Sequence, residues 1–260
     1  MIIDSNTHPT TSGIWFNSTI DASLSRLLSE MQVSGIDRSV IVPLPGSMTN
    51  DEVRNMVAGC PESCINAYTF NPALYSTSSI AQSEFESSFS GLPRSIVKFH
   101  NRFGGYQPDD ERFMTILKVN NSLKCPMVVA ICGFLHNRNS SKHIDTAGYF
   151  FDLALKFPST QFIIMHGGGC QILRIAEQCR DLQNVYIDLS YTLSRYRNSS
   201  VENDIRWLCE HFDKRLLWGS DFPEISVQRA WNDIIDLTSH ISIEKRNRIT
   251  GLNLLGILNE

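Results

Sequence analysis

The feature of this chain that most constrains its fold is a regular alternation of short apolar runs with longer amphipathic stretches. Short runs rich in Val, Ile and Phe, bounded by turn residues, are typical of strands that are buried on both faces. Eight such runs lie at residues 1–4, 39–42, 65–70, 96–100, 127–131, 162–165, 185–188 and 216–218. This alternation predicts a parallel sheet wrapped by helices, and eight repeats favour a closed (β/α)8 TIM barrel.

Helices are expected between the strands, because apolar residues recur there at helical spacing. In the first helix the apolar residues from Leu24 to Met31 fall on one face, Asp21 is the predicted N-cap, and Gly35 ends the helix. Further helices are predicted at residues 50–57, 80–89, 110–119, 147–156, 172–179 and 205–212, with a last one from 227 to the end. Each predicted strand is thus followed by a predicted helix.

The pattern runs through the chain without a linker, a low-complexity tract or an internal repeat, so we expect one domain over residues 1–260. An open, dinucleotide-binding sheet is the alternative fold. That fold needs spaced glycines directly after its first strand. Here the glycines at 167–169 are consecutive and follow the sixth strand, which favours the barrel.

Composition excludes several function classes. The chain has 260 residues, of which 42% are hydrophobic, and this is enough for one large core. A net charge of -4 gives no indication of a nucleic-acid partner, and no run is long enough to span a bilayer. The first strand begins at the N-terminus without a signal-like segment, and the seven cysteines form no CxxC pair. We therefore expect a cytoplasmic protein with reduced thiols.

Polar side chains follow several of the predicted strands. They are Asn6, His8, Lys98, His100, His166 and Asp221. The last of these ends the segment RLLWGSDFP at 215–223, where a lone Asp could simply cap the next helix. Several such groups are harder to explain by packing, because a buried charge must be paired or functional. In a barrel they would converge on one face, where barrel enzymes have their active sites.

The polar segments match the motifs of a known family, in the same order. Residues 4–8 read DSNTH, 97–102 read VKFHNR, 166–169 read HGGG and 219–223 read GSDFP. They resemble the D-x-H-x-H, K-[LI]-H-P-R, H-x-G-G and G-S-D-x-P motifs of the amidohydrolase-related, metal-dependent barrel hydrolases. Asn253 is similar to the Asn of that family's closing segment. The family includes decarboxylases of the aminocarboxymuconate type and lactonases of the pyrone-dicarboxylate type. The resemblance implies an enzyme with His166 as a catalytic residue.

The same resemblance implies one zinc ion, held by both histidines of H-x-H, a fifth-strand histidine and the final Asp. In this chain only His8 and Asp221 remain of those ligands. Asn6 replaces the first histidine, the fifth-strand histidine falls on Ala130, and His136 lies in the following loop. A catalytic zinc normally has three protein ligands. We therefore predict that a divalent metal binds weakly or not at all.

These residues predict a hydrolase that acts on a small anionic substrate, a lactone, ester or amide of a carboxylic acid. Asp221 would activate water and His166 would assist, with or without a metal. The predicted substrate-binding residues are Lys98, His100, Arg102, Asn6, Tyr191 and Arg195, with Arg197, Tyr106 and Trp15 as further candidates. The alternatives are a non-oxidative decarboxylase and a catalytically inactive barrel that binds a small acid. The oligomeric state stays open, and a homodimer is one option.

Overall fold

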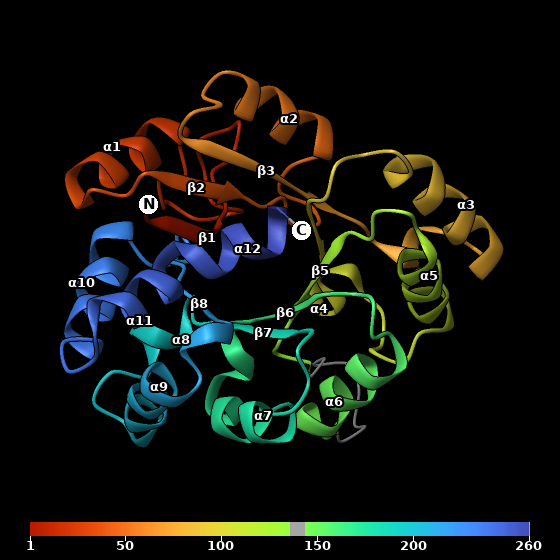
Figure 1. The fold of residues 1–260 in the computed structure, drawn as a ribbon. Coiled ribbons are helices and arrows are strands. Elements are labelled where there is room, and N and C mark those ends of the chain that lie inside the picture. The colour runs from red at the N-terminus through yellow and green to blue at the C-terminus, as the bar shows by residue number, and fades with distance from the viewer. Residues whose placement is uncertain (136–143, 260) are drawn as a thin grey trace.

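The computed structural model describes residues 1–135 and 144–259, and His136 lies outside the described residues. It is a (β/α)8 barrel, as predicted (Figure 1). The strands are β1 (Ile3–Thr7), β2 (Arg38–Ile41), β3 (Cys64–Thr69), β4 (Ile96–Phe99), β5 (Val128–Cys132), β6 (Phe162–Met165), β7 (Val185–Asp188) and β8 (Leu216–Leu217). Consecutive strands pair in parallel from β1 to β8. The Ser5 N–H donates to the Trp218 carbonyl (3.1 Å), which brings the first and last strands together.

The main helices form a ring outside the sheet (Figure 1). They are α1 (Leu24–Ser34), α2 (Asn50–Ala58), α3 (Ser78–Phe89), α5 (Glu111–Ser122), α6 (Thr146–Lys156), α7 (Ile172–Gln178), α9 (Ser200–His211) and α10 (Val227–Leu237). Two short helices, α4 (Asn101–Gly104) and α8 (Thr192–Arg195), lie in the loops after β4 and β7. These loops carry several of the predicted site residues.

The strands bury both of their faces in two apolar clusters. Val97 and Phe99 point outward into the layer between sheet and helices. Ile96 points inward with the interior cluster, and Lys98 shares its face because successive side chains of a strand alternate. Lys98 is only 1% exposed, so its charged end lies inside the barrel. The same alternation directs Ala130 and Cys132 of β5 inward.

The last predicted helix is not continuous. After α10 the chain forms α11 (Ile243–Asn247), a π-helical turn at Arg248–Leu252, and α12 (Asn253–Asn259). Gly251 permits the break, since a Cβ there would lie 2.4 Å from the Met1 carbonyl oxygen. Asn253 donates to the carbonyl oxygens of Asp213 (2.7 Å) and Leu216 (2.8 Å), which fixes α12 at the start of β8. The helix then packs its apolar face into the barrel interior.

Other local predictions were also wrong. Ser23, not Asp21, is the N-cap of α1: its hydroxyl accepts from the Arg26 N–H (3.2 Å), while the Asp21 carboxylate accepts from the Ser23 N–H (2.8 Å). The first strand continues to Thr7, because pairing with β2 extends that far, so Asn6 belongs to the strand. Strand β8 ends at Leu217, one residue before the predicted end.

Candidate functional site

A cavity of about 430 Å³ opens where the strands end. Eight predicted site residues line it: His8, Lys98, His100, Arg102, His166, Tyr191, Arg195 and Asp221. Trp15 lines it too, and its indole N–H donates to Glu224 (2.6 Å), a further lining residue that the sequence did not single out. The barrel thus brings together side chains that are more than 200 positions apart in the chain.

Asp221 follows β8 with its backbone in the left-handed region, at φ 68°. Its N–H donates to the Asn6 carbonyl (3.0 Å), and its Oδ1 accepts a hydrogen bond from Asn6 Nδ2 (2.8 Å). Burial raises the pKa of this carboxyl group, but the neighbouring His166, His8 and Lys98 outweigh burial and hold the pKa well below its usual range. Asp221 is therefore a carboxylate at neutral pH.

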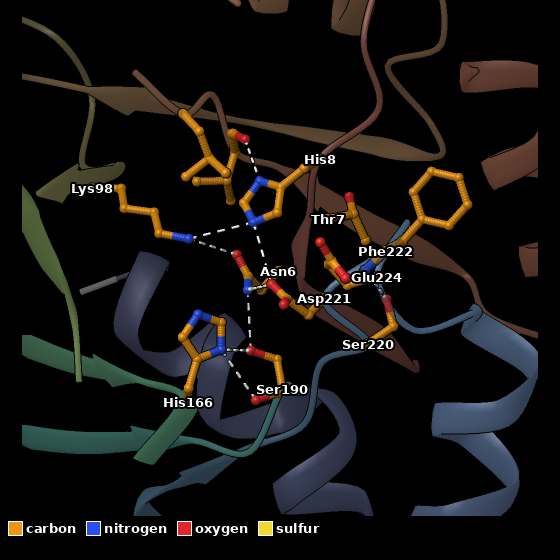
Figure 2. Close-up of polar contacts among 12 residues, drawn as sticks. Asn6, Thr7, His8, Lys98, His166, Ser190, Ser220, Asp221, Phe222 and Glu224 are labelled. Atoms are coloured by element: carbon orange, nitrogen blue, oxygen red, sulfur yellow. Dashed lines mark hydrogen bonds and ion pairs between the residues drawn. The ribbon is translucent and has the colours of Figure 1, made fainter. Parts of the chain in front are cut away.

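His8, Asn6 and Lys98 form a connected group beside Asp221 (Figure 2). His8 Nδ1 lies 2.6 Å from the Val42 carbonyl oxygen, which can only accept, so Nδ1 carries the proton. Burial, followed by the charge of Lys98, lowers the pKa of His8. We therefore assign His8 the neutral form, with Nε2 as an acceptor. Nε2 lies 3.4 Å from both Lys98 Nζ and Asp221 Oδ1.

His166 stands on the other side of Asn6, after β6 (Figure 2). Its Nδ1 lies 3.1 Å from the Ser190 carbonyl oxygen, which can only accept, so Nδ1 carries a proton and Nε2 is the ring nitrogen left to act in the cavity. Within residues 1–135 and 144–259, no hydrogen bond reaches Nε2. Phe134 stacks on the imidazole ring with centroids 5.5 Å apart. His166 can therefore accept or relay a proton in the cavity.

The sequence analysis missed the network that supports His166. Asp188 Oδ1 accepts hydrogen bonds from the His166 N–H (3.2 Å) and from the Ser190 N–H (3.2 Å) and hydroxyl. Asp188 Oδ2 accepts from the Ser5 hydroxyl. Asp188 ends the seventh strand, so the strand-end argument could have included it. Nothing in the sequence distinguishes Ser190 from the other serines.

Asp4 lies below this network and is fully buried. Its Oδ1 accepts from the N–H groups of Asn6 (3.2 Å) and Ser220 (2.9 Å). Burial nevertheless raises the pKa of Asp4 to about 7, since these hydrogen bonds compensate only in part. Asp4 thus holds the backbone on both sides of the site and does not line the cavity.

Three other candidate residues, Asn6, Arg197 and Tyr106, do not line the cavity. Asn6 is fully buried, and its amide donates to Asp221 and Ser190 and accepts from Lys98, so it lies beneath the cavity. Arg197 pairs with Glu202, Asp233 and Asp236 on neighbouring helices. Tyr106 is buried and packs against Phe113.

The donor atoms around Asp221 do not suit a zinc ion. In the described part of the chain, no group of three or more His, Cys, Asp or Glu side chains could hold a metal. The available atoms are His8 Nε2, Asp221 Oδ1 and Asn6 Oδ1, and Lys98 Nζ lies within 3.4 Å of the first and 3.3 Å of the last. An amino group there competes with a metal for the same lone pairs.

Comparison with known proteins supports the family assignment. A family model described as amidohydrolase matches residues 3–253, so the chain belongs to the amidohydrolase family. Its fold resembles that of an uncharacterised TIM-barrel protein from Bordetella bronchiseptica, with a TM-score of 0.77, 17% identity, and coverage of 99% of this chain and 98% of that one. No curated protein sequence matches this chain.

Two further solved structures share the fold. One is 5-carboxyvanillate decarboxylase from Sphingomonas paucimobilis, with a TM-score of 0.68, 15% identity and coverage of 99% and 98% of the two chains. The other is a probable 2-pyrone-4,6-dicarboxylic acid hydrolase from Acinetobacter baumannii with citric acid bound, with a TM-score of 0.64, 15% identity and coverage of 100% and 99%. Among the described residues, no helix is both long and apolar enough to cross a membrane.

Proposed function

We propose that this protein hydrolyses a small anionic carbonyl compound, a lactone, ester or amide of a carboxylic acid. Membership of the amidohydrolase family makes an enzyme plausible. The observation that carries the proposal is one cavity that contains an ionised carboxylate, an imidazole whose Nε2 has no hydrogen bond with the described residues, and two arginines that pair with none of the described residues either. This combination can activate water and bind an anion at the same place.

Asp221 would act as the general base. Its carboxylate takes a proton from water while the water oxygen adds to the substrate carbonyl. His166 Nε2 relays this proton to the leaving oxygen or nitrogen as the old bond to the carbonyl carbon breaks. Because the lowered pKa makes Asp221 a weak proton acceptor, the site suits an activated carbonyl group such as that of a lactone.

Two arginines support an anionic substrate. Arg102 and Arg195 line the cavity, and neither side chain has a hydrogen bond or ion pair with a residue in the described ranges. Arg197, only two positions from Arg195, is held by three carboxylates instead. A free guanidinium group at a cavity is suited to a carboxylate, which it binds through two parallel hydrogen bonds.

A panel of lactones and esters that carry a free carboxylate tests this function. The wild type should hydrolyse at least one of them, and Asp221→Asn should lower kcat by about 10²- to 10⁴-fold, the usual contribution of a general base. Asp181→Asn is the matched control, since that carboxylate is 90% exposed and does not line the cavity. Turnover by Asp221→Asn at the wild-type rate would contradict the assignment.

Two other outcomes would replace the proposal. Release of carbon dioxide from an aromatic acid, without hydrolysis of any lactone or ester, would favour the decarboxylase. Binding of small dicarboxylates without turnover of any compound would favour a barrel that only binds acids.

A further inference from the structure

Lys98 occupies an unusual position for a lysine. It is 1% exposed and lies inside the barrel, although a charged side chain is seldom fully buried without partners. Its Nζ lies 3.3 Å from Asn6 Oδ1 and 3.4 Å from His8 Nε2 (Figure 2). Burial lowers the pKa of Lys98, and the nearby negative charge of Asp221 opposes this shift. The amino group is therefore surrounded by acceptors.

The hydrogen bonds behind these neighbours fix which atoms face Lys98. His8 Nδ1 donates to the Val42 carbonyl, so His8 turns the lone pair of Nε2 toward Nζ. Asn6 Nδ2 donates to Asp221 Oδ1 (2.8 Å) and Ser190 Oγ (3.0 Å), so Asn6 turns its oxygen toward Nζ. A bound cation requires several lone pairs that point toward it. In this site the lone pairs of His8 Nε2 and Asn6 Oδ1 point toward Lys98 Nζ.

The two departures from the family motifs fit this arrangement. Asn6 donates two hydrogen bonds from its amide nitrogen, to Asp221 and Ser190, and accepts one from Lys98 with its oxygen, whereas a neutral imidazole has only one N–H to donate. Ala130 pairs with Lys98 in the parallel register of β4 and β5, and both side chains point into the barrel. A methyl group at 130 leaves room for the four-carbon stem of Lys98.

We propose that the Lys98 amino group is a built-in cation that occupies the position for which a metal ion would compete. It donates hydrogen bonds to Asn6 Oδ1 and His8 Nε2, and its charge attracts the Asp221 carboxylate. Since Lys98 also lines the cavity, its positive charge is available to the carbonyl oxygen of a substrate as negative charge develops there. This last role rests on the proposed hydrolysis; the occupancy of the cation position does not.

Zinc binding tests the occupancy directly. The wild type, Asn6→His, Lys98→Met and the double variant Asn6→His/Lys98→Met are purified without chelator, and zinc is measured by equilibrium dialysis and elemental analysis. The double variant has three ligands and no competing cation, so we expect it to bind about one zinc. Asn6→His alone should bind at least roughly tenfold more weakly, because two like charges a few ångströms apart repel strongly.

Circular dichroism and thermal melting show whether each variant folds, and zinc should raise the melting temperature only of the double variant. If Lys98→Met prevents folding, Lys98→Gln provides the same comparison with an uncharged polar side chain of similar length. Zinc bound as tightly by Asn6→His as by the double variant would overturn the proposal. Stoichiometric zinc retained by the wild type through dialysis would also overturn it.

A kinetic comparison tests the second role. On a hydrolysed substrate, Lys98→Met should lower kcat by roughly 10²-fold or more, the usual loss when a charge that stabilises an oxyanion is removed. Arg102→Met should mainly raise KM if Arg102 binds ground and transition states alike. An unchanged kcat in Lys98→Met would refute the catalytic role alone. If no substrate is hydrolysed, the proposed function fails, and the zinc comparison still decides what occupies the cation position.

Discussion

The two ends of this barrel are built from the same strands but differ in chemistry. At the amino end, Leu254 and Ile257 of α12 pack against Ile3 and other strand residues in a purely apolar cluster. At the carboxyl end, His8, Lys98 and Asp221 are equally buried but form a polar network. One end of the fold can therefore be optimised for stability, while the other holds charges whose burial is unfavourable.

The backbone shows the same division. His166, Tyr191 and Asp221 are non-glycine residues with φ between 60° and 68°, and all three line the cavity. Residues in this region typically cost of order 1–3 kcal/mol each. Two of them donate backbone hydrogen bonds that hold them in place: Asp221 to the Asn6 carbonyl and His166 to the Asp188 carboxylate. Phe16 and Asn198 also have positive φ but do not line the cavity, so three of the five such residues in the described chain lie at the site.

The largest expected effect is on activity at the carboxyl end. Asp221→Asn should lower kcat by about 10²- to 10⁴-fold. It should also lower the free energy of unfolding, because the lowered pKa of Asp221 means that the folded state favours the charged carboxylate over a neutral group. Stopped assays with a hydrolysed lactone measure the first quantity and urea denaturation the second. A large loss of stability together with a small loss of kcat would break the proposed division between the ends.

The opposite result is expected at the amino end. Leu254 is 1% exposed, and Leu254→Ala should lower the free energy of unfolding by about 2–5 kcal/mol through the cavity that it leaves. Turnover per folded molecule should not change. Leu252→Ala, at a residue that is 47% exposed, is the control and should have little effect on stability. A selective loss of turnover in Leu254→Ala would show that the two ends are coupled.

Asp4 predicts how stability depends on pH. The pKa of its carboxyl group has the ordinary value of 3.8 in the unfolded chain, and burial raises it to about 7 in the folded protein. Between these values the folded state binds more protons, so this group makes stability fall as pH rises from about 4 to 7. Asp4→Asn should remove at least about 1.4 kcal/mol of that change, the value of one pKa unit. Urea denaturation at pH 5 and pH 7 compares the two proteins, and equal slopes would contradict this prediction.

The smallest effect concerns the rim of the cavity. Arg195→Met should raise KM for an anionic substrate by about tenfold, the contribution of a charged hydrogen bond, with kcat nearly unchanged. Arg197→Met is the matched control, since Arg197 is held by carboxylates and does not line the cavity. Steady-state kinetics of both variants tests this difference. Equal changes in KM would mean that neither arginine binds the substrate directly.

Much of the fold could be predicted from local patterns. Short apolar runs located all eight strands, because a strand that is buried on both faces is apolar along nearly its whole length. Boundaries were less certain where tertiary contacts decide them. Pairing with β2 extends β1 to Thr7, and the approach of Gly251 to the Met1 carbonyl breaks the final helix. Neither contact could be predicted from the residues of the strand or helix that it ends, because the contacting partner is distant in the sequence.

The sequence alone determined the barrel and most of the residues that meet at its cavity, because the carboxyl ends of parallel strands must lie on one face. Only the tertiary structure decided what each side chain does there. Arg195 lines the cavity, whereas Arg197 forms ion pairs with carboxylates of α9 and α10. Lys98 Nζ lies between Asn6 Oδ1 and His8 Nε2. A long side chain has many conformers, and the charges that select one of them come from distant parts of the chain.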